Sequence, residues 1–255
     1  MKTIILCGGK GTRMKEETEF KPKPLVEVGG KPILWHIMKI YAHYGFNEFI
    51  LALGYKGQMI KDYFLNMKHF ANDFTLDTSN HSIELHSTNH DNFKITFADT
   101  GLETLTGERI LRVKKYLGNE DEFMLTYGDG VADIDLKKLV QFHKSQGTIA
   151  TLTGVKPRSR FGMMRVHPEN GIVSHFHQKP VLDDYISGGF MILNRKALDY
   201  IDQGWVENAF GKLTKEGQLS IYQHDGFWRA MDTYQEVEEL NKVWDDSRPW
   251  AVWEK

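Results

Sequence analysis

The chain has 255 residues and a formal net charge of −2, and 41% of its residues are hydrophobic. This length allows one large domain, or a core with an appendage. A nearly neutral charge balance lacks the bulk positive field of nucleic-acid-binding proteins, so we expect no nucleic-acid partner. No apolar run approaches 18 residues, so we expect no membrane span either.

The N-terminus enters a strand pattern at once, without a basic region and a cleavage site, so we expect no secretory signal. The single cysteine, Cys7, cannot form an internal disulfide. Thiols stay reduced in the cytoplasm, and the cysteine content therefore favours a cytoplasmic protein.

Predicted strands and helices alternate along the chain. The first element is a strand at Thr3–Cys7. Pro32–Tyr44 has apolar residues at helical spacing and is followed by Gly45, which predicts a helix. Further predicted strands are Phe49–Leu53, Lys94–Ala98, Phe123–Tyr127 and Ala150–Val155, and further helices are Lys56–Met67, Gly107–Tyr116 and Leu136–Gln146.

Strands separated by helix-length segments indicate βαβ crossovers, so we expect an α/β fold with a mostly parallel, Rossmann-like sheet flanked by helices. From Met163 to Asn194 the strand-like runs are shorter, which predicts a smaller appended sheet layer. We therefore expect a single domain over 1–255, with a core at about 1–155, a second part at about 156–233 and a C-terminal helix and tail at 234–255.

A glycine-rich turn follows the first strand. Gly8–Arg13 reads GGKGTR, and Lys23 follows inside KPKP (Lys21–Pro24). Glycine lets the backbone approach a ligand closely, and successive N–H groups in such a turn bind anions. The turn fits neither the Walker A pattern nor the dinucleotide-binding fingerprint. Together with the positive charges of Arg13 and Lys23, this turn predicts a polyphosphate site.

Two acidic residues form a second motif. Asp129 lies between Gly128 and Gly130 directly after a strand, and Asp232 lies in AMDT after the aromatic segment GFW. Parallel sheets bind ligands beyond the carboxyl ends of their strands, where Asp129 and the glycine turn both fall. An Asp between glycines can also be a plain turn residue. Mg²⁺ prefers oxygen ligands such as these together with substrate phosphates.

The opening, LCGGKGTR followed by KPKPLVEVGGKPILWHI, resembles that of the sugar-1-phosphate nucleotidyltransferases, and among them the glucose-1-phosphate cytidylyltransferases. The likeness continues in order through GYKG (Gly54–Gly57), ADTG (Ala98–Gly101), TGERILRV (Thr106–Val113), TYGDGVAD (Thr126–Asp133), RFG (Arg160–Gly162), GGF (Gly188–Phe190) and GFWRAMDT (Gly226–Thr233). Motifs in this order over most of the chain make the resemblance specific.

The resemblance implies transfer of CMP from CTP to a sugar 1-phosphate, by default glucose 1-phosphate, giving a CDP-sugar for surface polysaccharide and pyrophosphate. It assigns an Mg²⁺ cofactor to Asp129 and Asp232, and it places Arg13 on the β/γ-phosphates and Lys23 on the α-phosphate. The nucleotide-binding residues that it implies are Leu6, Gly8, Gly9, Lys10, Gly11, Thr12, Thr104, Arg109 and Gly128. Relatives of this kind are homo-oligomers, so further copies of the chain are expected partners.

For the sugar phosphate the resemblance implies Gln178, Lys179, Ser187 and Gly188. The chain departs from the family pattern in this region, because Gln178 replaces a Glu, Ser187 replaces an Asn, and Met163 replaces an Ala after RFG. Gln adds hydrogen-bond donors and removes a charge. A site whose polar partners change can prefer another substrate. A different sugar 1-phosphate or a polyol phosphate therefore stays open.

Two other classes of protein are alternatives. A non-catalytic regulatory homologue would share the fold, but the presence of Arg13, Lys23, Asp129 and Asp232, the residues predicted to be catalytic, argues against it. An oxidoreductase would need the dinucleotide fingerprint that the glycine turn lacks. Trp244, Trp250 and Trp253 near the C-terminus predict either a tail docked on the core or a subunit interface, where Trp is enriched.

Overall fold

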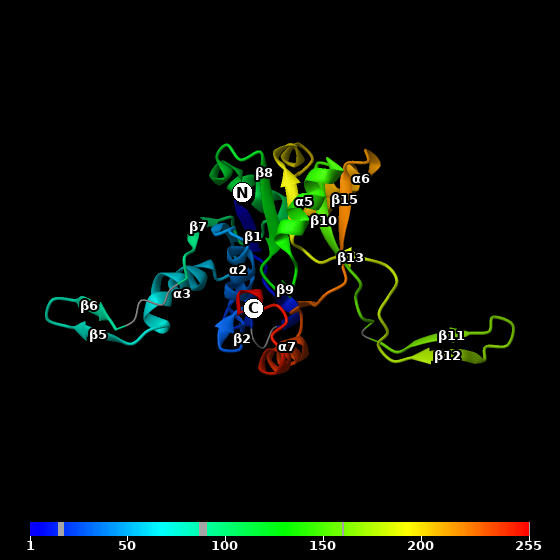
Figure 1. The fold of residues 1–255 in the computed structure, drawn as a ribbon, viewed down its shortest axis with the longest axis horizontal. Helices are drawn as coiled ribbons and strands as arrows, with labels where there is room; N and C mark the ends of the chain where they lie inside the picture. Colours follow the sequence, from blue (N-terminus) through cyan, green and yellow to red (C-terminus); the bar gives the residue numbers. More distant parts are fainter. Residues whose placement is uncertain (15–17, 87–90, 160, 255) are drawn as a thin grey trace.

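One mixed sheet forms the middle layer of the molecule, and helices cover both of its faces (Figure 1). The structure, a computed structural model, describes residues 1–14, 18–86, 91–159 and 161–254, and only the backbone of Arg13. The strands of the main sheet are β1 (Thr3–Cys7), β4 (Glu48–Leu53), β7 (Lys94–Asp99), β8 (Glu122–Tyr127), β10 (Ala150–Val155), β13 (Ile186–Ser187), β14 (Met191–Asn194) and β15 (Leu219–His224). The strand order is β13-β10-β14-β8-β1-β4-β7, and β15 pairs with β10. The predicted α/β fold is confirmed.

The α-helices are α2 (Ile33–His43), α3 (Gly57–Phe70), α4 (Thr106–Val113), α5 (Leu136–Gln146), α6 (Val206–Lys215) and α7 (Tyr234–Asp246). Short 3-10 helices are η1 (Thr12–Met14), η2 (Lys23–Leu25), η3 (Lys114–Leu117), η4 (Arg195–Asp199) and η5 (Val252–Glu254). Two-stranded ladders are β2 (Glu27–Val28) with β3 (Lys31–Pro32), β5 (Phe74–Asp77) with β6 (Ser82–Leu85), β9 (Gly130–Ala132) with β16 (Trp228–Ala230), and β11 (Met163–Val166) with β12 (Val173–His177). None of the helices described is long and apolar enough to cross a membrane.

The parallel half of the sheet agrees with the sequence prediction. β8, β1, β4 and β7 lie side by side in parallel register. Each strand predicted up to residue 155 is present, with its ends within one residue of the prediction, and each predicted helix is present. Because β1 and β8 are parallel neighbours, the glycine turn and Asp129 begin at the same edge of the sheet.

Alternate side chains of β1 enter two separate apolar cores. Ile4 and Leu6 belong to the core that α4 and α6 cover. Ile5 and Cys7 belong to the core that α2 and α7 cover. A central parallel strand buried on both faces has a continuous apolar sequence, as observed here. The two helix layers therefore fix β1, and the turn that follows it, from both sides.

The segment predicted to form an appended layer is divided in the structure. β11 and β12 form a separate ladder, whereas β13 and β14 join the main sheet in antiparallel pairing. β14 inserts between β8 and β10, where Met191, Ile192 and Leu193 are buried. A short apolar run has the same pattern in either sheet, so its periodicity cannot place it.

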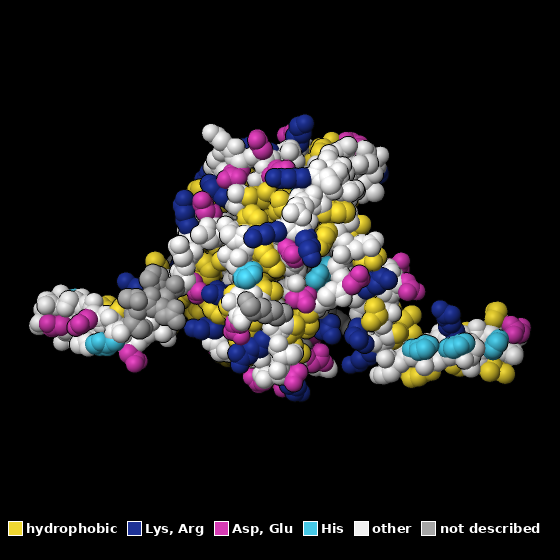
Figure 2. All heavy atoms as spheres, in the orientation of Figure 1, with side chains coloured by type: hydrophobic (Ala, Val, Ile, Leu, Met, Phe, Trp, Pro, Cys, Tyr) yellow, Lys and Arg dark blue, Asp and Glu magenta, His cyan; other side chains and the backbone are white. Residues whose placement is uncertain are grey.

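Two β-hairpins extend from opposite sides of the body (Figure 1). One is formed by β5 and β6, which were not predicted from the sequence, and the other by β11 and β12. Figure 2 shows hydrophobic side chains along the second hairpin, beside a row of histidines. The exposed apolar residues of this hairpin include Met163, Met164, Val166, Ile172, Val173 and Phe176.

The C-terminal tail docks on the core through its tryptophans. Trp250 is fully buried and stacks on Phe227 with ring centroids 5.3 Å apart. The rings of Trp244, Trp250 and Trp253 surround His36 of α2. Of the two roles predicted for these tryptophans, docking on the core is confirmed.

We expect His36 to make the folded state less stable in acid. Its Nε2–H donates to the Val28 carbonyl at 2.8 Å, and its Nδ1 accepts from Trp250 Nε1 at 3.3 Å, so the structure requires the neutral ring. Burial lowers the pKa of His36 to about 4. The unfolded chain binds this proton below about pH 6.5 and the folded chain only below about pH 4, so roughly 3 kcal/mol of stability is lost as the pH falls between these values.

Urea unfolding at a series of pH values from about 7 down to about 4.5 measures this loss. His36→Gln is the matched variant, because Gln offers a donor and an acceptor but does not titrate in this range. The free energy of unfolding of the variant should depend less steeply on pH than that of the wild type. Equal pH dependence in both proteins would show that His36 is not the titrating group.

Candidate active site

The glycine turn lies across the carboxyl ends of β1 and β8. The Gly8 carbonyl accepts from Tyr55 N at 3.2 Å, and Gly128 N donates to the Leu6 carbonyl at 3.1 Å. Gly11 has a φ of +61°, in the left-handed region that glycine adopts without strain. The two hydrogen bonds anchor the turn to the strand ends, and Gly11 occupies the position where the chain bends.

Arg109 of α4 holds this turn in place. Its side chain is 4% exposed. The guanidinium donates over 2.6 to 3.3 Å to the carbonyls of Gly8, Leu53, Gly101 and Leu102 and to Thr100 Oγ1. A planar guanidinium suits such a set of fixed acceptors better than an ammonium. Arg109 therefore organises the backbone of the region where the sequence predicts nucleotide binding.

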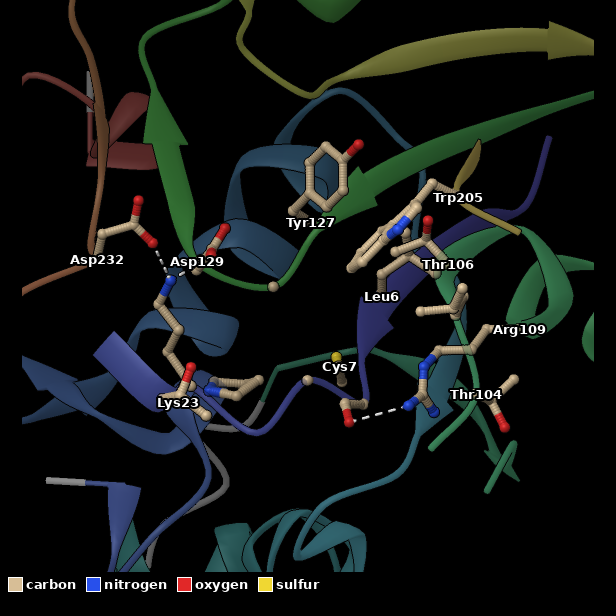
Figure 3. A pocket seen from close by; sticks show the side chains of 17 residues that line it. Leu6, Cys7, Lys23, Thr104, Thr106, Arg109, Tyr127, Asp129, Trp205 and Asp232 are labelled. Atoms are coloured by element: carbon tan, nitrogen blue, oxygen red, sulfur yellow. Dashed lines mark hydrogen bonds and ion pairs between the residues drawn. The ribbon is translucent and has the colours of Figure 1, made fainter. Parts of the chain in front are cut away.

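Lys23 lies between two carboxylates (Figure 3): its Nζ is 2.6 Å from Asp129 Oδ2 and 2.7 Å from Asp232 Oδ1. Pro22, which caps η2, and Pro24, which lies within it, flank Lys23 and restrict the backbone there. Burial opposes the charge on Lys23, but attraction and hydrogen bonds from Asp129 and Asp232 outweigh burial and raise its pKa. Lys23 is therefore a fixed cation at neutral pH.

A short antiparallel ladder brings the two carboxylates together. β9 follows Asp129, β16 precedes Asp232, and the two strands pair with each other. Glu236 then fixes the main chain, because its Oε2 accepts from the N–H groups of Asp232 and Thr233 at 2.7 and 2.9 Å. Thr233 and Glu236 form the capping box of α7. The two acidic motifs are thus one structural unit.

The same carboxylates fit a divalent cation. Both direct an oxygen at one point, at distances of 2.6 and 2.7 Å from a cationic nitrogen. Mg²⁺ is commonly held by one or two carboxylates together with substrate phosphates and water. In the described part of the chain no group of three or more His, Cys, Asp or Glu side chains could hold a metal by itself. The donor set therefore suits an ion that is shared with a phosphate ligand.

A cavity of about 360 Å³ connects these features, a size that suits a small-molecule ligand. The predicted site residues in its wall are Leu6, Gly8, Gly9, Gly11, Thr12, Lys23, Thr104, Arg109, Gly128, Asp129 and Asp232. Figure 3 shows the cluster of Lys23 with its two carboxylates at one end and Arg109, Thr104 and Trp205 at the other. We refer to the end that holds Lys23, Asp129 and Asp232 as the charged end of the cavity.

Some predicted residues are not part of this wall. The side chain of Arg13 lies outside the described residues, as does Arg160 of the RFG motif. Lys10 does not line the cavity, and its Nζ forms an ion pair with Glu103 Oε1 at 2.5 Å. Its contribution in the structure is to join the glycine turn to the segment that carries Thr104.

The residues predicted to bind the sugar phosphate are also not part of the cavity wall. Gln178 and Lys179 follow β12 and are exposed. Ser187 lies in β13 at the edge of the main sheet. The carbonyl of Gly188 accepts from Trp228 Nε1 at 2.8 Å, and Trp228 begins β16. This hydrogen bond links Gly188 to the ladder that carries the acidic pair.

Some residues of the cavity wall were not predicted from the sequence, namely Cys7, Pro24, Leu105, Thr106, Tyr127 and Trp205. Tyr127 directly precedes Gly128, so its place could have been inferred from its neighbour. Its hydroxyl donates to Glu207 Oε1 at 2.6 Å, and burial together with this carboxylate raises its pKa. Trp205 belongs to no motif in the sequence, and only the fold brings it to the cavity.

Comparison with known proteins establishes the family. A family model described as nucleotidyl transferase matches residues 2–246. The chain belongs to this family. This nucleotidyl transferase is 48% identical, over 99% of its length, to a probable glucose-1-phosphate cytidylyltransferase of Bacillus subtilis (strain 168). It is 43% identical over its whole length to a glucose-1-phosphate cytidylyltransferase of Salmonella typhi, and both matches cover the entire relative. The family predicted from the motifs is confirmed.

Solved structures share the fold of this nucleotidyl transferase. HddC from Yersinia pseudotuberculosis superposes with a TM-score of 0.69 at 22% identity, over 95% of this chain and 99% of that one. A putative glucose-1-phosphate thymidylyltransferase from Bacillus anthracis, in complex with a sucrose, gives a TM-score of 0.68 at 18% identity over 96% of each chain. At these identities the likeness shows the common architecture.

Proposed function

We propose that this nucleotidyl transferase moves CMP from CTP to a sugar 1-phosphate, with α-D-glucose 1-phosphate as the default acceptor, and releases pyrophosphate. Full-length relatives at 48% and 43% identity carry names for this activity, which supports the substrate assignment. The observation that carries the proposal is the meeting of Lys23 with Asp129 and Asp232 at the charged end of the cavity.

The proposed reaction needs positioning more than acid–base chemistry. A sugar 1-phosphate carries about −1.5 to −2 charges at neutral pH, and its phosphate oxygen is already a nucleophile. This oxygen attacks the α-phosphorus of CTP in line, the bond to the bridging β-phosphate oxygen breaks, and pyrophosphate leaves with that electron pair. Two polyanions must meet, so orientation and charge compensation supply most of the catalysis.

Lys23 is proposed to bind the α-phosphate and to stabilise the charge that develops on it, because its ammonium is held at the charged end. Arg13, on the glycine turn, is proposed to hold the leaving phosphates. A Cβ built at Gly9 meets nothing within 4 Å, so the backbone of the turn is open to a ligand there. Its N–H groups would add to the anion site.

Asp129 and Asp232 would hold Mg²⁺, which when bound orients and neutralises phosphate groups. Their oxygens also contact Lys23 Nζ directly. The two carboxylates therefore have a second role that depends on this chain alone, which is to keep Lys23 charged and in position.

The sugar phosphate is proposed to contact Gln178, Lys179, Ser187 and Gly188, within the part of the chain at about 156–233 that follows the nucleotide-binding core. The hydrogen bond from Trp228 to Gly188 supports this placement, because it connects that part to the acidic ladder. A cytoplasmic location is also proposed, since the single cysteine is a buried free thiol.

Pyrophosphate release tests the proposal, with Mg²⁺ and with CTP, UTP, dTTP, ATP and GTP each paired with a panel of sugar 1-phosphates and polyol phosphates. Turnover with CTP and glucose 1-phosphate is the expected result. Turnover of CTP with another acceptor alone would assign the new specificity to the region of Gln178 and Ser187. A protein that turns over no pair would be a regulatory homologue, and the proposal would be wrong.

We further propose that copies of the chain assemble through the β11–β12 hairpin. Met164 and Phe176 are paired directly across this ladder and are 61% and 60% exposed. Apolar surface exposed in this way marks interaction sites on soluble proteins. Contact with a second copy would bury it.

The double change Met164→Lys with Phe176→Lys is expected to lower the molar mass that light scattering measures after size exclusion. His175→Lys is the matched control, because successive side chains of a strand point to opposite faces and His175 is the neighbour of Phe176. The control should keep the mass of the wild type. A monomeric wild type, or a double variant of unchanged mass, would refute this interface.

A further inference from the structure

Trp205 is an exposed aromatic side chain inside the cavity wall. It precedes α6, it is 55% exposed, and it lies at the end of the cavity away from Lys23 (Figure 3). An indole in this position gains burial only when a ligand covers it. Its exposure therefore points to a contact with substrate.

The backbone around Trp205 is fixed in advance. The Gly204 carbonyl accepts from Gly107 N at 2.9 Å, and Val206 N donates to Thr106 Oγ1 at 2.9 Å. Gly107 leaves no room for a Cβ against this loop, so the loop packs directly on the start of α4. A surface held on both sides in this way loses little freedom when a ligand binds.

The two ends of the cavity suit different parts of one nucleotide. The cluster of Lys23 with Asp129 and Asp232 suits phosphates and their cation. At the other end Trp205 offers a flat apolar surface, and the guanidinium of Arg109 is already hydrogen-bonded to protein oxygens. A nucleobase has apolar faces and a polar edge, which is what this end can receive.

We propose that the indole of Trp205 stacks on the base of the bound nucleoside triphosphate, while the polar edge of the base faces the main chain that Arg109 holds. This inference rests on the proposed function, because it takes the charged end as the triphosphate site. Stacking on an aromatic ring tolerates every base. Trp205 therefore supplies affinity for the nucleotide, and contacts between the main chain and the polar edge of the base determine which base binds.

Calorimetric titration with CTP and with inorganic tripolyphosphate, both with Mg²⁺, tests the role of Trp205. Trp205→Ala should weaken CTP binding by roughly 5- to 100-fold, the usual effect of removing a stacking ring, and should leave tripolyphosphate binding unchanged. Trp205→Phe should retain most of the CTP affinity. The matched control is Tyr116→Ala, an exposed aromatic residue outside the cavity wall, which should bind both ligands as the wild type does.

Unchanged CTP binding in Trp205→Ala would overturn the proposal, because the indole would then contribute nothing to affinity. An equal loss of affinity for CTP and for tripolyphosphate would also overturn it, because tripolyphosphate has no base on which the indole could stack. Titration with UTP, ATP and GTP separates this proposal from the proposed function. If the wild type binds another nucleotide in place of CTP and Trp205→Ala weakens that one, the stacking role holds and only the choice of CTP is wrong. A wild type that binds no nucleotide would overturn both.

Discussion

Asp129→Asn is expected to lower kcat for nucleotidyl transfer by about a thousandfold or more, which corresponds to roughly 4 kcal/mol of transition-state stabilisation. Asn keeps the shape of the side chain and removes its charge. Lys23 would lose the partner that lies 2.6 Å from its Nζ, and the pKa of Lys23 would fall as a result. The site for a divalent cation would lose one of its two carboxylates at the same time.

Steady-state kinetics of pyrophosphate release measure this effect, and the Mg²⁺ concentration for half-maximal activity should rise in the variant. The matched control is Asp202→Asn, because Asp202 also pairs with a lysine, Lys212, at 3.0 Å, but on the surface and outside the cavity wall. Surface ion pairs contribute little, so this control should retain full activity. If Asp129→Asn were as active as Asp202→Asn, the acidic cluster would not be the catalytic centre.

Gly8→Ala is expected to destabilise the protein by about 3 kcal/mol, or roughly 6 to 12 °C in Tm for a chain of this size. A Cβ at Gly8 would lie 2.1 Å from Arg109 Nη1. The guanidinium cannot move aside freely, because it is buried and hydrogen-bonded to the main chain of three neighbouring segments. Its displacement would leave buried carbonyls without their donors.

The adjacent glycine provides the control. A Cβ at Gly9 meets nothing within 4 Å, and Gly9 is not among the residues with positive φ. Gly9→Ala should therefore unfold in urea at the same midpoint as the wild type, or slightly higher because Ala restricts the unfolded chain. Equal stability of the two alanine variants would contradict the bracing role of Arg109.

The parts of the site that the sequence could predict are those with local signals. β1 is a continuous apolar run that stops at Gly8, and its length and end are visible without any tertiary information. Asp129 follows a second strand in the same way. Parallel pairing of these strands places both ends at one edge, so the convergence of the glycine turn with Asp129 follows from fold class alone.

The parts that could not be predicted depend on contacts distant in sequence. The family resemblance predicts Arg109 at the nucleotide site, but it does not show that the acceptors of Arg109 come from the ends of β1, β4 and β7. Asp232 meets Asp129 through a ladder of short strands that have no distinctive pattern. Trp205 reaches the cavity because the loop before α6 packs on α4, which nothing near Trp205 in the sequence encodes.

Mass spectrometry of the products formed from CTP and glucose 1-phosphate in the presence of Mg²⁺ tests the proposed transfer of CMP most directly. We predict CDP-glucose in an amount equal to the pyrophosphate released, and about a thousandfold less CDP-glucose in the same time with the Asp129→Asn variant. Release of pyrophosphate with CMP in place of a CDP-sugar, or the absence of any product from the wild type, would contradict the proposed transfer.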